Sequence, residues 1–162
     1  MTDSQEDPRT PEGAAVTETR SLVRDLAVAV DGSPPSREGL RLAADIARRT
    51  GARVTVVHIR HAPALEEMGA EAGGISLEET LAAVEQAVRQ DAVDILGEAS
   101  PGWRFVVRTG SPGREIIEAA RELEVDLIIV GSEPHSTLHN LVLGSTAQYL
   151  VAHSPVRVLV AR

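Results

Sequence analysis

The sequence predicts an α/β protein built on a doubly wound, open, five-stranded parallel sheet with helices on both faces. Short runs of valine, isoleucine and leucine alternate with longer amphipathic segments from residue 22 to the end of the chain. The runs are nearly continuous in apolar residues, which is typical of strands that are covered on both faces. The segments between them have the length of crossover helices, and right-handed crossovers place helices on both sides of a sheet.

Five apolar runs are predicted as the strands. They are rich in β-branched residues, which favour a pleated and buried conformation. The predicted strands are residues 26–30, 54–59, 105–107, 127–130 and 156–160. The last of them is expected to lie at an edge of the sheet, where its unpaired backbone groups invite pairing with a second copy.

Four helices are predicted between the strands. The first, residues 36–50, has small and apolar residues on one face and stops at Gly51, which suits the left-handed conformation beyond a helix end. The second starts at Ser76, whose capping box is completed by Glu79. The third opens at Ser111 and Pro112, because proline is tolerated in a first turn, and the fourth runs from Ser145 to about residue 153.

Two segments are predicted to lie outside these elements. Residues 1–21 are polar and contain Pro8, Pro11 and Gly13, so we expect a disordered N-terminal tail followed by one domain over residues 22–162. The connection of residues 61–75 is longer than usual and contains three glycines. A connection of this length is either a mobile lid or a plain insertion.

Composition narrows the functional classes. The chain has 162 residues, a net charge of -8 and a single residue each of Trp, Tyr and Phe, which argues against a nucleic-acid partner. It has no cysteine, and all 16 of its basic Lys and Arg residues are Arg, which excludes disulfides, thiolate metal sites and a lysine-dependent phosphate loop. No apolar run approaches the length of a membrane span, so we expect no membrane association and a cytoplasmic location.

The sequence offers no arrangement of residues for catalysis and no metal site. It has neither a G-x-S-x-G turn nor a G-x-G-x-x-G motif after the first strand. His135 and His139 have zinc-ligand spacing only in a helix, and we expect a solvated loop there. His58, inside a buried strand, is predicted to be a hydrogen-bonded core histidine. We therefore expect a protein that binds rather than an enzyme.

Small and polar residues follow three of the predicted strands, at the sheet edge where ligands bind in such folds. Asp31 after the first strand suits ribose hydroxyls or a metal, or else only a turn. The glycines at 110 and 113 leave a helix N-terminus open to an anion, or form an ordinary cap. Turns at Gly131 and Gly144 flank one loop, and the second exposes N–H groups at a helix start, which favours a phosphate.

These motifs resemble the universal stress protein family over residues 25–162. The resemblance rests on VAVDGS at 28–33, VVHI at 56–59, Gly110-x-Pro112, DLIIVGS at 126–132 and LGSTAQYLVAHSPVRVLVAR at 143–162. It implies an adenine nucleotide alpha hydrolase-like sheet in the order 3-2-1-4-5, which brings the ends of the first and fourth strands together. It also implies a stress-response regulatory protein that forms homodimers through the C-terminal strand from Val156 to Arg162.

The nucleotide-binding branch of that family carries the motif G-x2-G-x9-G-[ST] after the fourth strand. The resemblance implies ATP or AMP as ligand, with Mg²⁺. By this resemblance Asp31 would face the ribose and adenine edge, and the backbone of Ile59 would contact adenine. The residues that would hold the phosphates are Gly131, Gly144, Ser145 and Thr146.

This chain departs from the motif at two positions that weaken binding. Pro134 replaces the second glycine, which removes a backbone N–H and fixes φ near −65°. Glu133 adds a negative charge beside the phosphates. Two alternatives therefore stand beside nucleotide binding: a dimeric interaction module without a nucleotide, and a slow ATPase in the same pocket.

Overall fold

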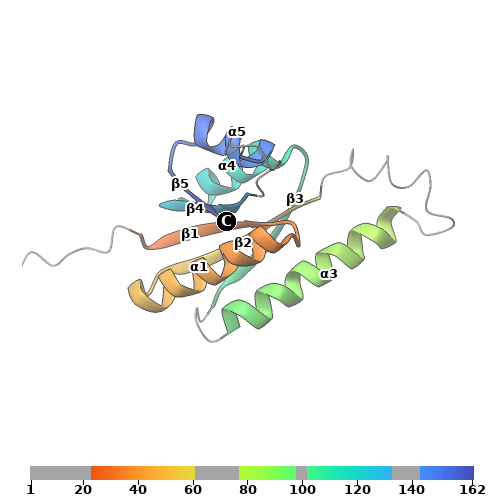
Figure 1. Ribbon diagram of the computed structural model, residues 1–162, viewed down its shortest axis with the longest axis horizontal. Helices are drawn as coiled ribbons and strands as arrows, with labels where there is room; N and C mark the ends of the chain where they lie inside the picture. Colours follow the sequence, from red (N-terminus) through yellow and green to blue (C-terminus); the bar gives the residue numbers. More distant parts are fainter. Residues whose placement is uncertain (1–22, 61–76, 98–101, 133–142) are drawn as a thin grey trace, which may run out of the picture.

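The computed structural model describes residues 23–60, 77–97, 102–132 and 143–162. Strands and helices alternate through these residues (Figure 1). In chain order they are β1 (Asp25–Val30), α1 (Pro34–Thr50), β2 (Arg53–Arg60), α3 (Leu77–Leu96), β3 (Arg104–Thr109), α4 (Pro112–Glu122), β4 (Leu127–Gly131), α5 (Ser145–His153) and β5 (Arg157–Ala161). The predicted tail, the connection of residues 61–75, the capping residue Ser76 and the motif positions 133 and 134 lie outside the described residues.

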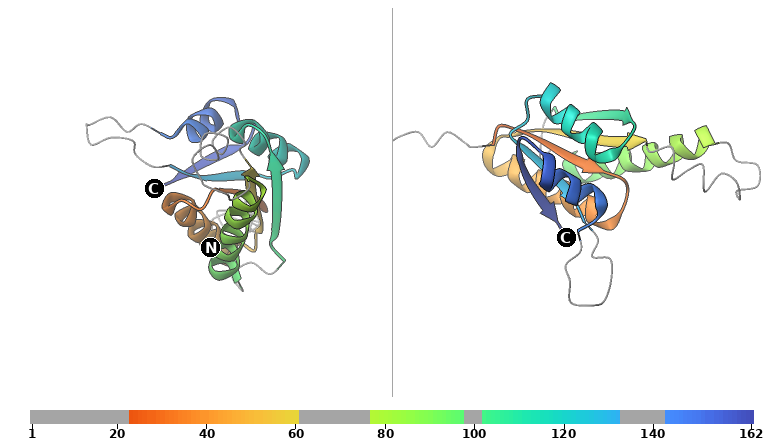
Figure 2. Two further views of the ribbon diagram at one scale, coloured as in Figure 1. Left: turned by 90° about the vertical axis from the view of Figure 1, so that its right-hand side faces the viewer. Right: turned by 90° about the horizontal axis from the view of Figure 1, so that it is seen from above.

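The five strands form one parallel sheet in the order β3-β2-β1-β4-β5. This order confirms the predicted fold and places β5 at an edge. Helices α1 and α3 cover one face, and α4 and α5 cover the other, as two views at right angles show (Figure 2). The chain therefore changes from one face to the other at β3, between α3 and α4, as the doubly wound topology requires.

The central strand shows why the sequence folds in this way. Leu26 and Val28 of β1 pack on the α1 and α3 side, whereas Ala27 and Ala29 pack on the α4 and α5 side. All four are buried. Successive residues of a strand point to opposite faces, so only an unbroken apolar run can fill both layers of the core.

Helix ends follow local chemistry, with one correction to the prediction. Helix α1 begins at Pro34, two residues before the expected start, because prolines fit a first turn and the Ser33 hydroxyl accepts from the N–H of Ser36. Gly51 ends α1 with φ +72°, as predicted. Helices α4 and α5 begin at the predicted Pro112 and Ser145.

No helix in the described part of the chain is long and apolar enough to cross a membrane.

Candidate functional site

A pocket of about 250 Å³ lies where the carboxyl ends of β1, β2 and β4 meet the first turns of α1, α4 and α5. The sheet order reverses at this place, because the crossovers run outward from β1 to β2 on one side and from β4 to β5 on the other. Ligands of open α/β sheets bind at such switch points. The position of the pocket is therefore the one expected from the strand-end residues.

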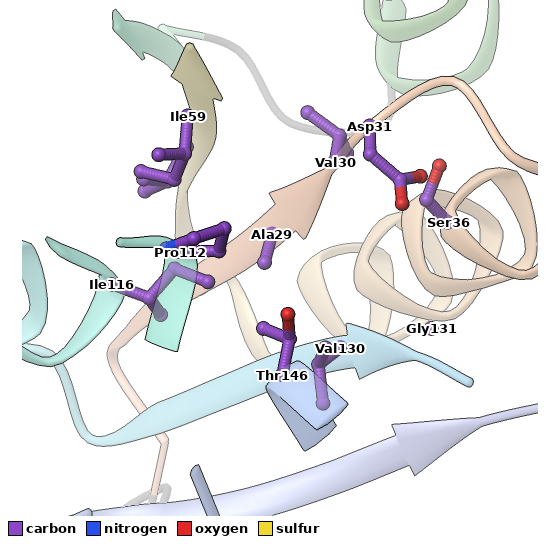
Figure 3. A pocket seen from close by; sticks show the side chains of 11 residues that line it. Ala29, Val30, Asp31, Ser36, Ile59, Pro112, Ile116, Val130, Gly131 and Thr146 are labelled. Atoms are coloured by element: carbon purple, nitrogen blue, oxygen red, sulfur yellow. The ribbon is translucent and has the colours of Figure 1, made fainter. Parts of the chain in front are cut away.

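The pocket has two chemically distinct ends (Figure 3). Ile59 from β2 and Pro112 and Ile116 from α4 form an apolar end. Asp31 and Ser36 lie together at the other end, beside the N-terminus of α1. Thr146 enters from the first turn of α5 with its hydroxyl between the two ends. A ligand that fits both ends needs a flat apolar part joined to a polar part.

Asp31 serves the turn and still faces the pocket. Its Oδ1 atom accepts a hydrogen bond of 2.9 Å from the N–H of Ser33, and Gly32 between them has φ +87°. Among the described residues, the second carboxylate oxygen has no hydrogen-bond partner. The side chain is exposed, so this oxygen is available to a ligand. The structure thus shows that Asp31 has the turn role, which the sequence left as one of two alternatives. The turn occupies only one of its two carboxylate oxygens.

The N-termini of α1 and α5, both at the pocket, differ in what they offer an anion. Pro34 and Pro35 have no N–H, and the N–H of Ser36 donates to the Ser33 hydroxyl at 3.3 Å, so the first turn of α1 has no free donor. In α5 the N–H of Gly144 donates to Ser132 Oγ at 2.9 Å. The next three N–H groups, of Ser145, Thr146 and Ala147, meet no acceptor in the described part of the chain. Helix α5 is therefore the better anion end.

Gly131 has a packing role that the motif did not reveal. A Cβ atom on this residue would lie 2.4 Å from the carbonyl carbon of Pro35 and 2.6 Å from the Ser36 nitrogen. Real Cβ atoms do not approach backbone so closely, so only glycine lets the start of α1 rest on the end of β4. Glycine here is explained without a ligand, although the residue also borders the pocket.

The structure brings four of the six predicted site residues to the pocket wall: Asp31, Ile59, Gly131 and Thr146. Gly144 and Ser145 do not line it; they cap and begin α5. The sequence reading missed the apolar wall formed by Ala29, Val57, Pro112 and Ile116. Apolar residues at strand ends and in a first helical turn are the signal that points to such a wall once the strand order is known.

His58 is the core histidine that the sequence predicted. It is 3% exposed, and its Nδ1 atom lies 2.9 Å from the carbonyl oxygen of Val30. Its ring stacks on Phe105, with the centroids 6.5 Å apart. Because Val57 and Ile59 line the pocket and strand residues alternate, His58 faces the opposite side of the sheet. It takes no part in the pocket.

The described residues contain no group of three His, Cys, Asp or Glu side chains that is placed to hold a metal ion. His135 and His139 lie outside the described residues.

A model of the universal stress protein family matches residues 23–162. The chain belongs to this family. It is 30% identical over 141 residues to a universal stress protein of Thermus aquaticus, an alignment that covers 87% of this chain and 100% of the relative. Among solved structures, the universal stress protein UspA from Lactobacillus plantarum superimposes with a TM-score of 0.67 at 27% identity, covering 86% of this chain and 98% of the other. The Archaeoglobus fulgidus protein in complex with dAMP has a TM-score of 0.59 at 22% identity, with coverage of 87% and 99%.

Proposed function

We propose that this universal stress protein is a regulatory stress-response protein that acts by binding an adenine nucleotide in the pocket at the ends of β1, β2 and β4. The observation that carries the proposal is the division of this pocket into an apolar and a polar end at the switch point of the sheet. The protein then has no reaction to catalyse. Occupancy of the pocket is its signal.

The apolar end suits a base. Ile59, Pro112 and Ile116 offer flat apolar surface on which an aromatic ring excludes water. Strand β1 pairs with β2 only as far as Val30 opposite His58, so Ile59 extends past the end of β1. This extension supports a role for its backbone at the adenine edge.

The polar end suits a ribose and a phosphate. The free oxygen of Asp31 is placed to accept from ribose hydroxyls, and Thr146 together with the open N–H groups of α5 is placed to hold a phosphate. The dAMP complex of the Archaeoglobus fulgidus protein supports the proposal, because that protein has the same fold and binds an adenine nucleotide.

Calorimetric titration with AMP tests the proposal, with two matched variants in α5. Thr146→Phe places a ring in the pocket and should weaken AMP binding at least about 100-fold. Val151→Phe adds the same ring to a side chain that is 57% exposed and should leave the affinity unchanged. No heat of binding from the wild type, or equal affinities in both variants, would contradict the proposal. Circular dichroism confirms that both variants fold.

One observation favours a second candidate, a dimeric interaction module without a nucleotide. Gly131, a motif residue that the family resemblance assigns to the phosphates, is already required by the packing of Pro35. Its presence therefore does not demand a ligand. Absence of AMP binding by the wild type, with a stable dimer, is the result that selects this candidate. For the slow ATPase alternative, the described residues offer no supporting arrangement.

We also propose that the protein is a homodimer paired through the strand β5 and that it works in the cytoplasm. Edge position and the half-buried apolar side chains of Val158, Leu159 and Val160 support the pairing. A ligand that orders the start of α5 acts on the element directly before β5, which gives occupancy a route to the dimer surface.

A further inference from the structure

We infer that the outer surface of helices α4 and α5 docks an acidic segment of a partner protein. The two helices are in contact and lie on one face of the sheet (Figure 1). A groove of about 280 Å³ runs between them, and we call it the α4–α5 groove. Its lining residues are Arg114, Ile117, Glu118, Arg121, Tyr149 and His153.

The α4–α5 groove is separate from the pocket at the strand ends. The two share no lining residue. Ile116 lines the pocket, whereas Ile117, the next residue of α4, lines the groove. The inference therefore goes beyond the proposed function, and it holds whether or not a nucleotide binds in the pocket.

Two arginines give the groove an excess of positive charge. Arg114 is exposed and has no partner in the described part of the chain. Arg121 pairs with Glu118 at 2.9 Å, and these side chains are 55% and 47% exposed. Exposed ion pairs of this kind contribute little to stability, because water competes for both charges. Arg121 can therefore exchange Glu118 for a carboxylate of a partner at small cost.

The other carboxylates of α4 lie outside the groove. Glu115 and Glu122 accept hydrogen bonds from Arg108 of β3 at 2.9 Å and 2.7 Å, so both are engaged on the β3 side of the helix. Helix α5 contains no acidic residue. The described residues have as many arginines as Asp and Glu residues together, so they present no net negative charge that would repel an acidic segment.

An aromatic platform lies beside these charges. The rings of Tyr149 and His153 stack with their centroids 4.3 Å apart, and Tyr149 is 39% exposed. A Cβ atom on Gly113 would lie 2.4 Å from Cδ1 of Tyr149, so the ring packs directly on the backbone of α4. A ring that is already held in place loses little conformational freedom when an apolar side chain packs on it.

The spacing of the two arginines defines the occupant. Arg114 and Arg121 are two helical turns apart, roughly 10 Å along α4. An extended chain covers this distance in about three residues. A segment with carboxylates about three residues apart and an apolar side chain between them therefore matches both arginines and the platform. Tyrosine and arginine are also the residue types that often dominate the binding energy of an interface.

Fluorescence anisotropy of a dye-labelled peptide EEEFEEE, titrated with the full chain, tests the inference. We expect this peptide to bind at least about tenfold more tightly than the matched peptides SSSFSSS and KKKFKKK, because only its charges complement the arginines. Salt screens the attraction, so its affinity should fall as salt is added.

Variants locate the binding. Arg114→Glu and Arg121→Glu should each weaken binding of EEEFEEE at least about tenfold. Arg41→Glu is the matched control for Arg121→Glu, because Arg41 pairs with Glu38 at 3.0 Å in the same helical spacing, with 58% and 49% exposure, on the opposite face of the sheet. It should leave the affinity unchanged. Tyr149→Ala should also weaken binding, whereas Tyr149→Phe keeps the ring and should not.

Four results would overturn the inference. The first two are no binding of EEEFEEE and equal effects of Arg121→Glu and Arg41→Glu. Tighter binding of an oligothymidylate than of EEEFEEE would assign the groove to nucleic acid instead. A change of oligomeric state in Arg114→Glu, measured by light scattering, would show that a second copy of the chain covers the groove. None of these results depends on AMP binding in the pocket, so failure of this inference is distinguishable from failure of the proposed function.

Discussion

Gly131 lies so close to Pro35 that a Cβ atom on the glycine would come within 2.4 Å of the proline carbonyl carbon. The end of β4 and the first turn of α1 are thus in direct backbone contact. This contact holds the start of α1, and with it the turn of Asp31, against the sheet. The polar end of the pocket therefore rests on backbone packed against backbone, which is possible because Gly131 has no side chain.

Gly131→Ala should therefore lower the free energy of unfolding by about 1–3 kcal/mol, because backbone on both sides has no room to move. Gly144→Ala is the matched control from the same motif. Among the described residues, its Cβ would meet nothing closer than Ser132 Oγ at 3.9 Å, and its φ of −57° suits alanine. We expect a change below about 1 kcal/mol there. Urea unfolding of the two variants measures both values, and equal losses would contradict the packing role.

The fold could be predicted well from the sequence because the strands of the sheet are nearly continuous runs of apolar residues. Both faces of β1 are buried, so its five consecutive apolar residues leave no other interpretation than an inner strand. Strand ends differed by at most one residue, except that β3 ends two residues later than predicted. The start of α1 differed by two residues, because prolines at the start of a helix resemble a turn in the sequence. Strand order came from the family resemblance, since the runs themselves do not say which strands are neighbours.

The pocket could be predicted only in part. Asp31 and Gly131 were found because both follow a strand directly. Pro112 and Ile116 were missed, because their place opposite Ile59 depends on α4 lying over β2, which is a property of the tertiary structure. A glycine that is needed for close packing cannot be distinguished in a sequence from a glycine that lets a ligand approach closely. Only the atoms around Gly131 separate them.

A second close contact joins α4 to α5. A Cβ atom on Gly113 would lie 2.4 Å from Cδ1 of Tyr149, whose ring also stacks on His153 at 4.3 Å. Gly113→Ala should destabilise the protein by about 1–3 kcal/mol, because the ring has to leave its place. In a Tyr149→Ala background the same change should cost little. A double-mutant cycle by urea unfolding measures the coupling, and additive effects would show that the two residues are independent.

Asp126 predicts a pH dependence of stability. Its Oδ2 atom accepts from the N–H groups of Arg24 at 2.8 Å and Asp25 at 3.0 Å, which ties the start of β1 to the start of β4. The hydrogen bond from Arg24 first, and then that from Asp25, lowers the pKa of this carboxyl. A lowered folded-state pKa gives stability that is present above the ordinary value of about 3.9 and is lost as the pH falls through the folded-state pKa.

Asp126→Asn removes the charge and keeps an acceptor oxygen. At pH 7 the variant should be about 1–2 kcal/mol less stable than the wild type, since hydrogen bonds to a charged acceptor are the stronger ones. The difference should shrink as the pH is lowered below about 3.9, where the carboxyl is protonated first in the unfolded state and, at lower pH, in the folded state. Urea unfolding across this range measures it, with Asp94→Asn as the charge-matched control. A difference that stays constant with pH would contradict the assignment.

The position of β5 at the edge of the sheet indicates which substitution should disrupt a dimer without unfolding the chain. The carbonyl of Ala161 accepts from the N–H of Ser132, so the backbone of Ala161 faces β4. Directions alternate along a strand, and the N–H of Val160 therefore faces the open edge. Val160→Pro removes a donor that β4 does not use and should give a folded monomer by light scattering at micromolar concentration. Ala161→Pro is the contrasting variant and should lower stability, because proline in that ladder costs a hydrogen bond with β4. A monomeric wild type, or a dimer that survives Val160→Pro, would show that the copies do not pair through β5.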